Sequence, residues 1–175
     1  ALAGSARSLL NYCDYRGRFE EGLALLREAI DSPLAARDAA LHTLFTAQAA
    51  HLEYRLDRYA QAQADASRAL ASAQLPRDLA AKIQALTVLA SCAMQTDRLE
   101  EARTLYRQSL ELVRTEQNPH NKAATLDNLA LVEKRLGHYD EALRLSLESP
   151  AQHRLLGDSA GVALCLNNLG ALYKQ

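Results

Sequence analysis

The chain has 175 residues, enough for one large domain, and Ala and Leu are by far its commonest residues. The β-branched residues Val, Ile and Thr contribute only 13, so the composition favours helices and argues against a β-sandwich, a barrel or a parallel-sheet enzyme. With 20 Lys and Arg against 21 Asp and Glu, the chain lacks the basic excess of a nucleic-acid-binding domain.

The sequence shows no sign of a membrane or a secretory protein. It contains no run of 18 apolar residues, and its start lacks the basic and apolar regions of a signal peptide. Cys13, Cys92 and Cys165 have neither disulfide nor zinc spacing, so we expect buried, reduced thiols in a cytoplasmic protein. Because the initiator Met is missing, we expect a piece of a longer chain.

Taken in chain order, the sequence repeats itself four times with a constant period of 40 and no gaps. Each copy has a turn residue, then a basic residue or His, a large apolar residue and, three positions later, a small residue. The turn residues are Gly17, Asp57, Asp97 and Gly137, and the small residues are Gly22, Ala62, Ala102 and Ala142. Gly allows a positive φ and Asp is expected to cap the following helix, so each copy predicts a helix, a tight turn and a second helix.

The segment before each turn has the pattern of a helix face. Leu126, Leu129 and Ala130 recur one period later as Leu166, Leu169 and Gly170. Leu at i and i+3 with a small residue at i+4 predicts the buried side of the first helix in each pair.

These motifs resemble tetratricopeptide repeats. Leu166, Leu169, Gly170 and Tyr173 match that family's first helix, and Gly137, Tyr139 and Ala142 match its turn and second helix. The resemblance implies an all-α, right-handed superhelical solenoid of antiparallel helix pairs. The usual period is 34, and the longer period of 40 is similar to repeats in kinesin light chains and large bacterial transcription regulators.

The period divides residues 1–175 into a single repeat domain of about nine helices. The predicted repeats are about 3–42, 43–82, 83–122 and 123–162, with a truncated fifth at 163–175. The last helix lacks a partner and a polar cap, so we expect the native protein to continue. Pro150 is predicted to kink or break the second helix of the fourth repeat near Ser149.

The sequence carries no recognisable catalytic motif of three common kinds. There is no phosphate-binding loop, nucleophile elbow or His-Glu-x-x-His motif, and the five histidines lack metal-ligand spacing. We therefore predict a protein that is not an enzyme and that has no cofactor and no metal. The basic column of Arg18, Arg58 and Arg98 is expected to pair with nearby acids at the start of each second helix.

The resemblance implies a concave face lined by the first helix of each repeat, which would bind a protein or peptide. Carried over column by column, its positions are polar in most repeats. The predicted partner-binding residues are Arg7, Asn11, Asp14, Tyr15, His51, Tyr54, Arg55, Gln84, Thr87, Ser91, Gln95, Asp127, Asn128, Leu131, Lys134, Arg135, Asn167, Asn168, Ala171 and Lys174.

Asn128 and Asn168 occupy the same column, one period apart. An amide offers both a donor and an acceptor, so each could bond a ligand's peptide unit or brace the neighbouring repeat, and the sequence leaves both open. Lys134 and Lys174, with the arginines of this face, favour an acidic ligand, although solvated charges would give the same pattern.

Four functions remain in competition. The first is a non-catalytic protein- or peptide-binding scaffold within a larger bacterial regulatory or signalling protein. The alternatives are the small-molecule sensor arm of a transcription regulator, which a compact apolar pocket at a repeat junction would favour, and self-association as a homodimer through the truncated last helix. An enzyme is the fourth and least favoured. The sequence predicts no nucleic-acid or membrane partner for this domain.

Overall fold

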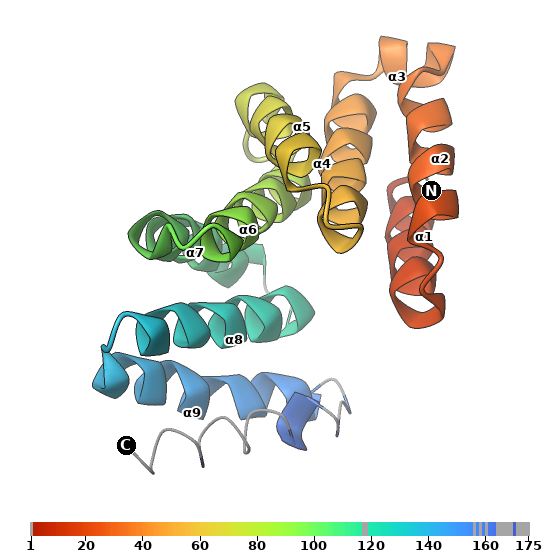
Figure 1. Ribbon diagram of the computed structural model, residues 1–175. Helices are drawn as coiled ribbons and strands as arrows, with labels where there is room; N and C mark the ends of the chain where they lie inside the picture. Colours follow the sequence, from red (N-terminus) through yellow and green to blue (C-terminus); the bar gives the residue numbers. More distant parts are fainter. Residues whose placement is uncertain are drawn as a thin grey trace. The chain divides into compact units, whose positions relative to one another are not determined.

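In the computed structural model, described for residues 2–116, 119–155, 157, 159, 161–163 and 170, the chain is helical and these residues form no strand. Figure 1 shows the helices in chain order. They are α1 (Leu2–Arg16), α2 (Phe19–Ile30), α3 (Pro33–Arg37), α4 (Ala39–Arg55), α5 (Tyr59–Ser72), α6 (Leu79–Gln95), α7 (Leu99–Glu116), α8 (Pro119–Arg135) and α9 (Tyr139–Leu155). The predicted all-α fold of helix pairs is confirmed.

Each first helix ends at a residue in the left-handed conformation, at the four predicted turn positions. The φ angles are 67° at Gly17, 58° at Asp57, 59° at Asp97 and 80° at Gly137. In three turns the amide after this residue donates to the carbonyl five residues earlier, as in Arg58 N to Glu53 O at 2.9 Å. This is the Schellman arrangement, which ends one helix and lets the next begin two residues later.

The structure corrects the role predicted for Asp at the turn. The residue before α5 is Arg58, whose side chain makes no capping hydrogen bond, and Asp57 itself lies one position earlier with a positive φ. The carboxylate of Asp57 accepts a hydrogen bond from the hydroxyl of Tyr59 at 2.6 Å. Asp57 therefore substitutes for Gly in the left-handed turn and does not cap α5.

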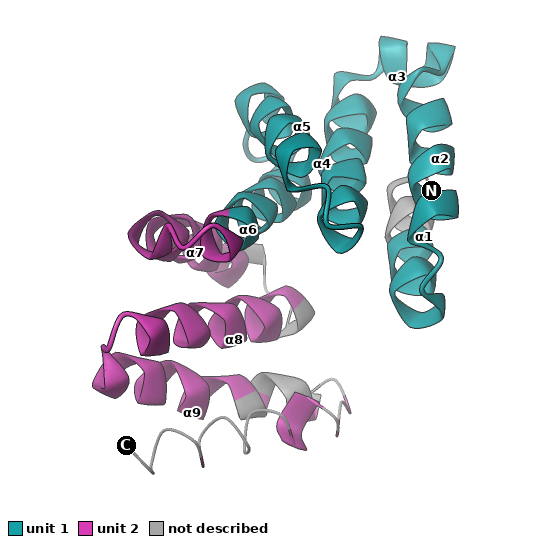
Figure 2. Cartoon of the chain, in the orientation of Figure 1, with its two compact units in different colours: residues 1–92 teal, residues 93–175 magenta. Residues whose placement is uncertain are grey.

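The chain divides into two compact units, residues 1–92 and residues 93–175, which Figure 2 shows in teal and magenta. The first unit has two apolar clusters. One joins the first two repeats around Leu26, Phe45 and Leu52, and the other, between α4, α5 and α6, consists mainly of alanines such as Ala66 and Ala85. Small side chains at these positions allow the helices to pack at close range.

In the second unit, α8 packs against both α7 and α9. The largest fully buried side chains here are bulky: Tyr106 and Leu145 from the second helices, and Leu126, Leu129 and Val132 from α8. The burial of Leu126 and Leu129 confirms the helix face that the repeat predicted. The two units thus fill equivalent positions with side chains of different size.

The predicted small residue at the start of each second helix is buried in all four repeats. A Cβ added to Gly22 would lie 2.3 Å from the Sγ atom of Cys13, closer than atoms can approach. The small column therefore permits close contact between the two helices of a pair. Cys13 and Cys92 are free thiols and both are buried, as predicted, while Cys165 lies outside the described residues.

Two features of the structure differ from the prediction, and a third predicted feature lies outside the described residues. The short helix α3, which begins with Pro33 after the capping residue Ser32, was not predicted. Helix α9 continues through Pro150 to Leu155, so the predicted break near Ser149 is wrong. Packing overrides the local effect of Pro, because Leu145 and Ser149 are fully buried on this helix. Most of the predicted final helix, 163–175, lies outside the described residues.

Candidate partner-binding face

The predicted binding residues of the fourth repeat form a stripe along α8. Asp127, Asn128 and Lys134 are half-buried, and Leu131 and Arg135 are exposed. Residues three or four positions apart lie on the same side of a helix, so this spacing places the five side chains along one side of α8.

Two members of this stripe are engaged within the protein. Asp127 accepts a hydrogen bond from the hydroxyl of Ser149 on α9 at 2.5 Å. Arg135 donates to the backbone oxygen of Met94 at 3.0 Å and to the carboxylate of Asp97 at 2.9 Å, at the end of α6. Both side chains therefore hold neighbouring helices together.

The other three members are at least partly accessible in the part of the chain that the structure describes. Leu131 is 45% exposed, a high value for a leucine in the middle of a helix. Within the described part of the chain, Asn128 and Lys134 make none of the hydrogen bonds or ion pairs found for their neighbours. An amide, an apolar side chain and an ammonium group in a row can contact a peptide's backbone, an apolar side chain and an acidic group.

In the first unit, three predicted binding residues come together and contact one another. The carboxylate of Asp14 on α1 pairs with Arg55 on α4 and lies 3.4 Å from Nε2 of His51. Burial acts to raise the pKa of Asp14, but the hydrogen bond from His51 and the charge of Arg55 outweigh it and hold the pKa below its usual value. Arg55 also covers the ring of Phe19 at 4.6 Å from its centroid.

The remaining predicted residues are dispersed. Asn11 and Gln95 are exposed, and Gln84 is half-buried. Tyr54 contacts the ring of Tyr59, with 5.7 Å between the centroids. The side chain of Arg7 and all of Asn167, Asn168 and Lys174 lie outside the described residues.

One member of the Asn128 column was missed from the sequence. Gln48 precedes Asn128 by two periods and is 3% exposed, and its Oε1 atom is buried without a hydrogen-bond partner. Val88, one period before Asn128, is also buried. Among the described members of this column, Gln48 and Val88 are therefore buried, Asn128 is half-buried and Ser8 on α1 is exposed. Counting back two periods from Asn128 would have identified Gln48.

The predicted pairing of the basic column at the turns with nearby acids is confirmed. Arg18 and Arg98 each bind the glutamate three residues later, and Arg58 binds Glu20 of the preceding repeat at 2.6 Å. These side chains are exposed, so they contribute little to stability.

A stronger polar contact recurs between consecutive repeats. Arg27 on α2 pairs with the buried Glu53 on α4, and two periods later Arg107 on α7 pairs with the buried Glu133 on α8 at 2.7 Å. In each case an arginine of a second helix reaches a glutamate on the next first helix. The equivalent positions between these two pairs are Ser67 and Ala93, so both the cation and the anion are replaced there.

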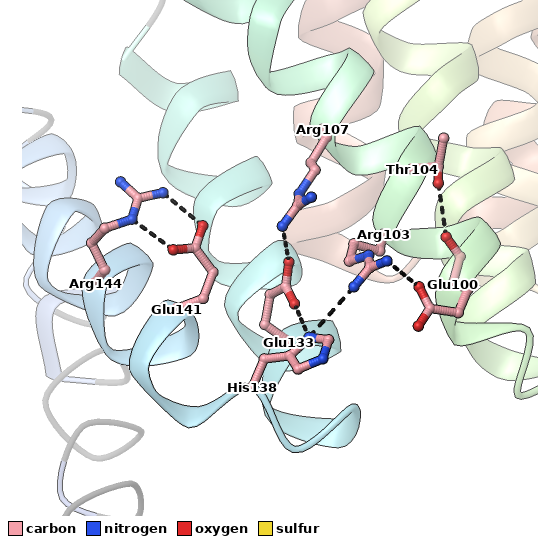
Figure 3. Close-up of polar contacts among 8 residues, drawn as sticks. All are labelled: Glu100, Arg103, Thr104, Arg107, Glu133, His138, Glu141 and Arg144. Atoms are coloured by element: carbon pink, nitrogen blue, oxygen red, sulfur yellow. Dashed lines mark hydrogen bonds and ion pairs between the residues drawn. The ribbon is translucent and has the colours of Figure 1, made fainter.

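Figure 3 shows how Glu133 is satisfied. One of its oxygens accepts from Arg107, and the other lies 2.7 Å from Nδ1 of His138, which we assign as the protonated nitrogen of the ring. Arg103 lies 3.5 Å from the same nitrogen, which as a donor cannot accept a hydrogen bond from it, and Arg103 pairs instead with Glu100 on α7. This network is an internal brace between α7 and α8.

The alternative of a small-molecule sensor depends on an apolar pocket at a repeat junction. The structure has a cavity of about 240 Å³ in the first unit, lined by His42, Thr43, Thr46, Arg68, Ala69, Ala71 and Ser72. It lies between α4 and α5 of a single repeat, its lining is mixed, and it is smaller than most ligand sites. This cavity is not the compact apolar junction pocket that would favour a sensor arm.

No helix among the described residues is long and apolar enough to cross a membrane. In the same part of the chain, no three His, Cys, Asp or Glu side chains gather as ligands for a metal ion.

Comparison with known proteins agrees with this architecture. The tetratricopeptide repeat model matches residues 80–149. The regulatory protein AfsR of Streptomyces griseus is 32% identical over 114 residues, which are 65% of this chain and 12% of that protein. This chain thus spans only a small part of the length of the regulator it matches.

Solved structures show the same fold at low sequence identity. BtubC from P. vanneervenii has a TM-score of 0.71 and 23% identity, covering 89% of this chain and 66% of that one. The TPR-like repeats of a putative kinesin light chain from Podosopora anserina have a TM-score of 0.61 and 14% identity, covering 97% and 93%. With helix pairs, turns and small-residue columns in place, the chain has the fold of tetratricopeptide-repeat proteins with a repeat period of 40, and its residues 80–149 match that family.

Proposed function

We propose that the chain is a non-catalytic scaffold that binds a protein or peptide, within a larger bacterial regulatory protein. Tetratricopeptide repeats are in general scaffolds for protein interaction, and the matched relative is a regulatory protein. The buried, free thiols of Cys13 and Cys92 support a cytoplasmic location.

The observation that carries the proposal is the open part of the α8 stripe. Asn128, Leu131 and Lys134 are accessible and unengaged within the described residues. The two arginines of the predicted face, Arg55 and Arg135, instead connect neighbouring repeats. The partner segment therefore has an apolar side chain for Leu131 and an acidic group for Lys134. Its backbone hydrogen-bonds to the amide of Asn128.

Site-specific photo-crosslinking tests this proposal. A photoreactive residue replaces Leu131 in the full-length protein, and a matched control carries it at Gln108, which is exposed on the second helix α7. We expect a discrete crosslinked polypeptide from position 131 and none from position 108 in living cells. Equal crosslinking from both positions, or none from position 131, would reject α8 as the binding face.

A further inference from the structure

The cavity between α4 and α5 is a feature that the proposed function does not use. Its volume is about 240 Å³. Three of its seven lining residues are buried and form its floor: Thr43, Thr46 and Ala69. The other four are exposed and form its rim: His42, Arg68, Ala71 and Ser72. The cavity is therefore closed by packed side chains at the floor and open to solvent at the rim.

The floor is hollow because α4 carries a short side chain where later first helices carry a long one. Thr46 stands one period before Leu86 and two periods before Leu126, and both leucines are buried. A threonine at this position leaves unfilled the space that the end of a leucine side chain takes up in the later repeats. The second repeat is thus under-packed at a position that the third and fourth repeats fill.

Helix α5 leaves the cavity open from the other side. It ends at Ser72, whereas the equivalent helix α7 continues for another turn to Glu116. In that last turn Leu112 is half-buried and Val113 is buried, at the positions that Ser72 and Ala73 occupy in the second repeat. Both helices of the second repeat therefore lack large apolar side chains at the same place.

The cavity is large enough for a small organic molecule with an apolar chain. An apolar cavity of about 150 Å³ is enough to hold benzene, so this one admits a branched chain of about six carbon atoms. The hydroxyl groups of Thr43 and Thr46 donate to the backbone oxygens of Ala39 and His42, each at 2.8 Å. Because both hydroxyl hydrogens are used within α4, the threonines offer no donor to an anion at the floor.

The rim, in contrast, can hold an anion. Among the described residues that line the cavity, Arg68 carries a positive charge, His42 can carry one, and none is acidic. One nitrogen of Arg68 contacts Asp65, a carboxylate that also pairs with Arg27. The side chain of Arg68 is 66% exposed, and a guanidinium has five N–H donors, so donors remain for a ligand at the rim.

We propose that this cavity binds a short, branched aliphatic carboxylate. The apolar chain occupies the floor, in the place of the leucine that the later repeats carry, and its removal from water drives binding. The carboxylate lies at the rim, where Arg68 and His42 orient it through charge-assisted hydrogen bonds. The site is separate from the α8 stripe, so either proposal can fail without the other.

A nuclear magnetic resonance titration of the 175-residue chain tests the site. Isocaproate is the probe, and isohexanol is the matched uncharged compound with the same carbon skeleton. We expect saturable shifts of the amide signals of Thr43, Thr46 and Ala69. The expected Kd is about 1 mM or lower for isocaproate and at least about tenfold higher for isohexanol.

Four variants locate the ligand within the cavity. Thr46→Leu fills the floor from α4 and should abolish the saturable shifts, and Ser72→Leu fills the cavity from α5 with the same result, so the test survives if one of them does not fold. Arg68→Gln should raise the Kd of isocaproate by about fivefold or more. Arg58→Gln is the matched control at another exposed arginine of this helix pair, and it should leave the Kd unchanged.

Two sets of results would overturn the proposal. The absence of saturable shifts with isocaproate, or an unchanged Kd in both filled variants, would show that the cavity is not a ligand site. Equal Kd values for isocaproate and isohexanol, or an unchanged Kd in Arg68→Gln, would show that the rim does not select a carboxylate.

Discussion

The interface between α2 and α4 and the interface between α7 and α8 use the same ion pair, two periods apart, with different surroundings. Glu133 is fully buried and both of its oxygens have partners, Arg107 and His138. Glu53 shares Arg27 with a second buried carboxylate, Asp65, and its Oε2 atom has no hydrogen-bond partner. The same two residue types are thus satisfied in one unit and only partly satisfied in the other.

The difference shows that two ion pairs at equivalent positions of the repeat can contribute differently to the stability of the protein. Burial and the charge of Asp65 raise the pKa of Glu53, against the opposing effect of Arg27. The neighbouring apolar positions differ as well, since Ala49 in the first unit corresponds to Leu129 in the second. The first interface combines an alanine at this position, beside Leu26 and Phe45, with an under-satisfied acid, and the second combines a leucine with a satisfied one.

The largest effect is expected from the apolar column. Leu129→Ala places in the second interface the alanine that the first interface has at Ala49. It should lower the free energy of unfolding by about 2–5 kcal/mol, because it leaves a cavity at a fully buried position. Urea denaturation followed by circular dichroism measures it. The reverse change, Ala49→Leu, should also destabilise, by about 1–3 kcal/mol, through overpacking. A loss under about 0.5 kcal/mol for Leu129→Ala would contradict the assigned packing.

The next effect separates the two ion pairs. Arg27→Met leaves Glu53 and Asp65 buried without their shared cation and should cost about 3 kcal/mol, reduced from the usual range because Arg27 is 39% exposed on its side chain. Arg107→Met should cost about 1–2 kcal/mol, since Glu133 retains His138. Equal losses in urea denaturation would show that Asp65 does not distinguish the interfaces.

Two acids of the first unit also predict opposite pH dependence. Because folding raises the pKa of Glu53, its contribution to stability is complete below the unfolded pKa and is lost as the pH rises through the folded value. The stability of Glu53→Gln relative to the wild type should therefore increase as the pH rises from acid to neutral. Folding lowers the pKa of Asp14, so Asp14→Asn should lose most near neutral pH and less as the pH falls through the folded value. If the urea midpoints of the two variants changed in parallel across this range, the assignment would be refuted.

The smallest effect concerns the turns. Asp57→Gly should stabilise the protein by about 0.5 kcal/mol, because Gly adopts the positive φ of 58° without strain. Asp97→Gly should gain less, because it also removes the ion pair with Arg135. Thermal unfolding of the two variants ranks them, and a destabilisation by Asp57→Gly would mean that its bond to Tyr59 outweighs the strain.

The repeat explains why the fold could be predicted. A constant period of 40 located the turns at Gly17 and Gly137 and the buried positions of Leu126 and Leu129, since each depends on contacts within one pair or with its neighbour. The role of Asp57, the helix α3 and the continuity of α9 through Pro150 were missed. In α9, packing against α8 decides a position where local preference points the other way.

The sequence predicted where the candidate binding residues lie on the helices, but not which of them stay accessible to a partner. The sequence placed Arg55, Arg135 and Asn128 on first helices, but it contains no signal that the two arginines would bind Asp14 and Asp97. Partners from the preceding repeat decide which polar side chains remain open, and those pairs form only when the helices stack. The face that remains accessible on α8 is therefore smaller than the predicted one.

The dissociation constant of the crosslinked partner tests the central claim most directly. It is measured with the wild-type protein, with Asn128→Ala/Lys134→Ala and with the control Gln108→Ala, after confirming equal stability. We predict at least a tenfold weaker complex for the double variant, from the loss of an amide contact and a charge-assisted one, and an unchanged constant for the control. Equal affinity for all three proteins would contradict α8 as the binding face.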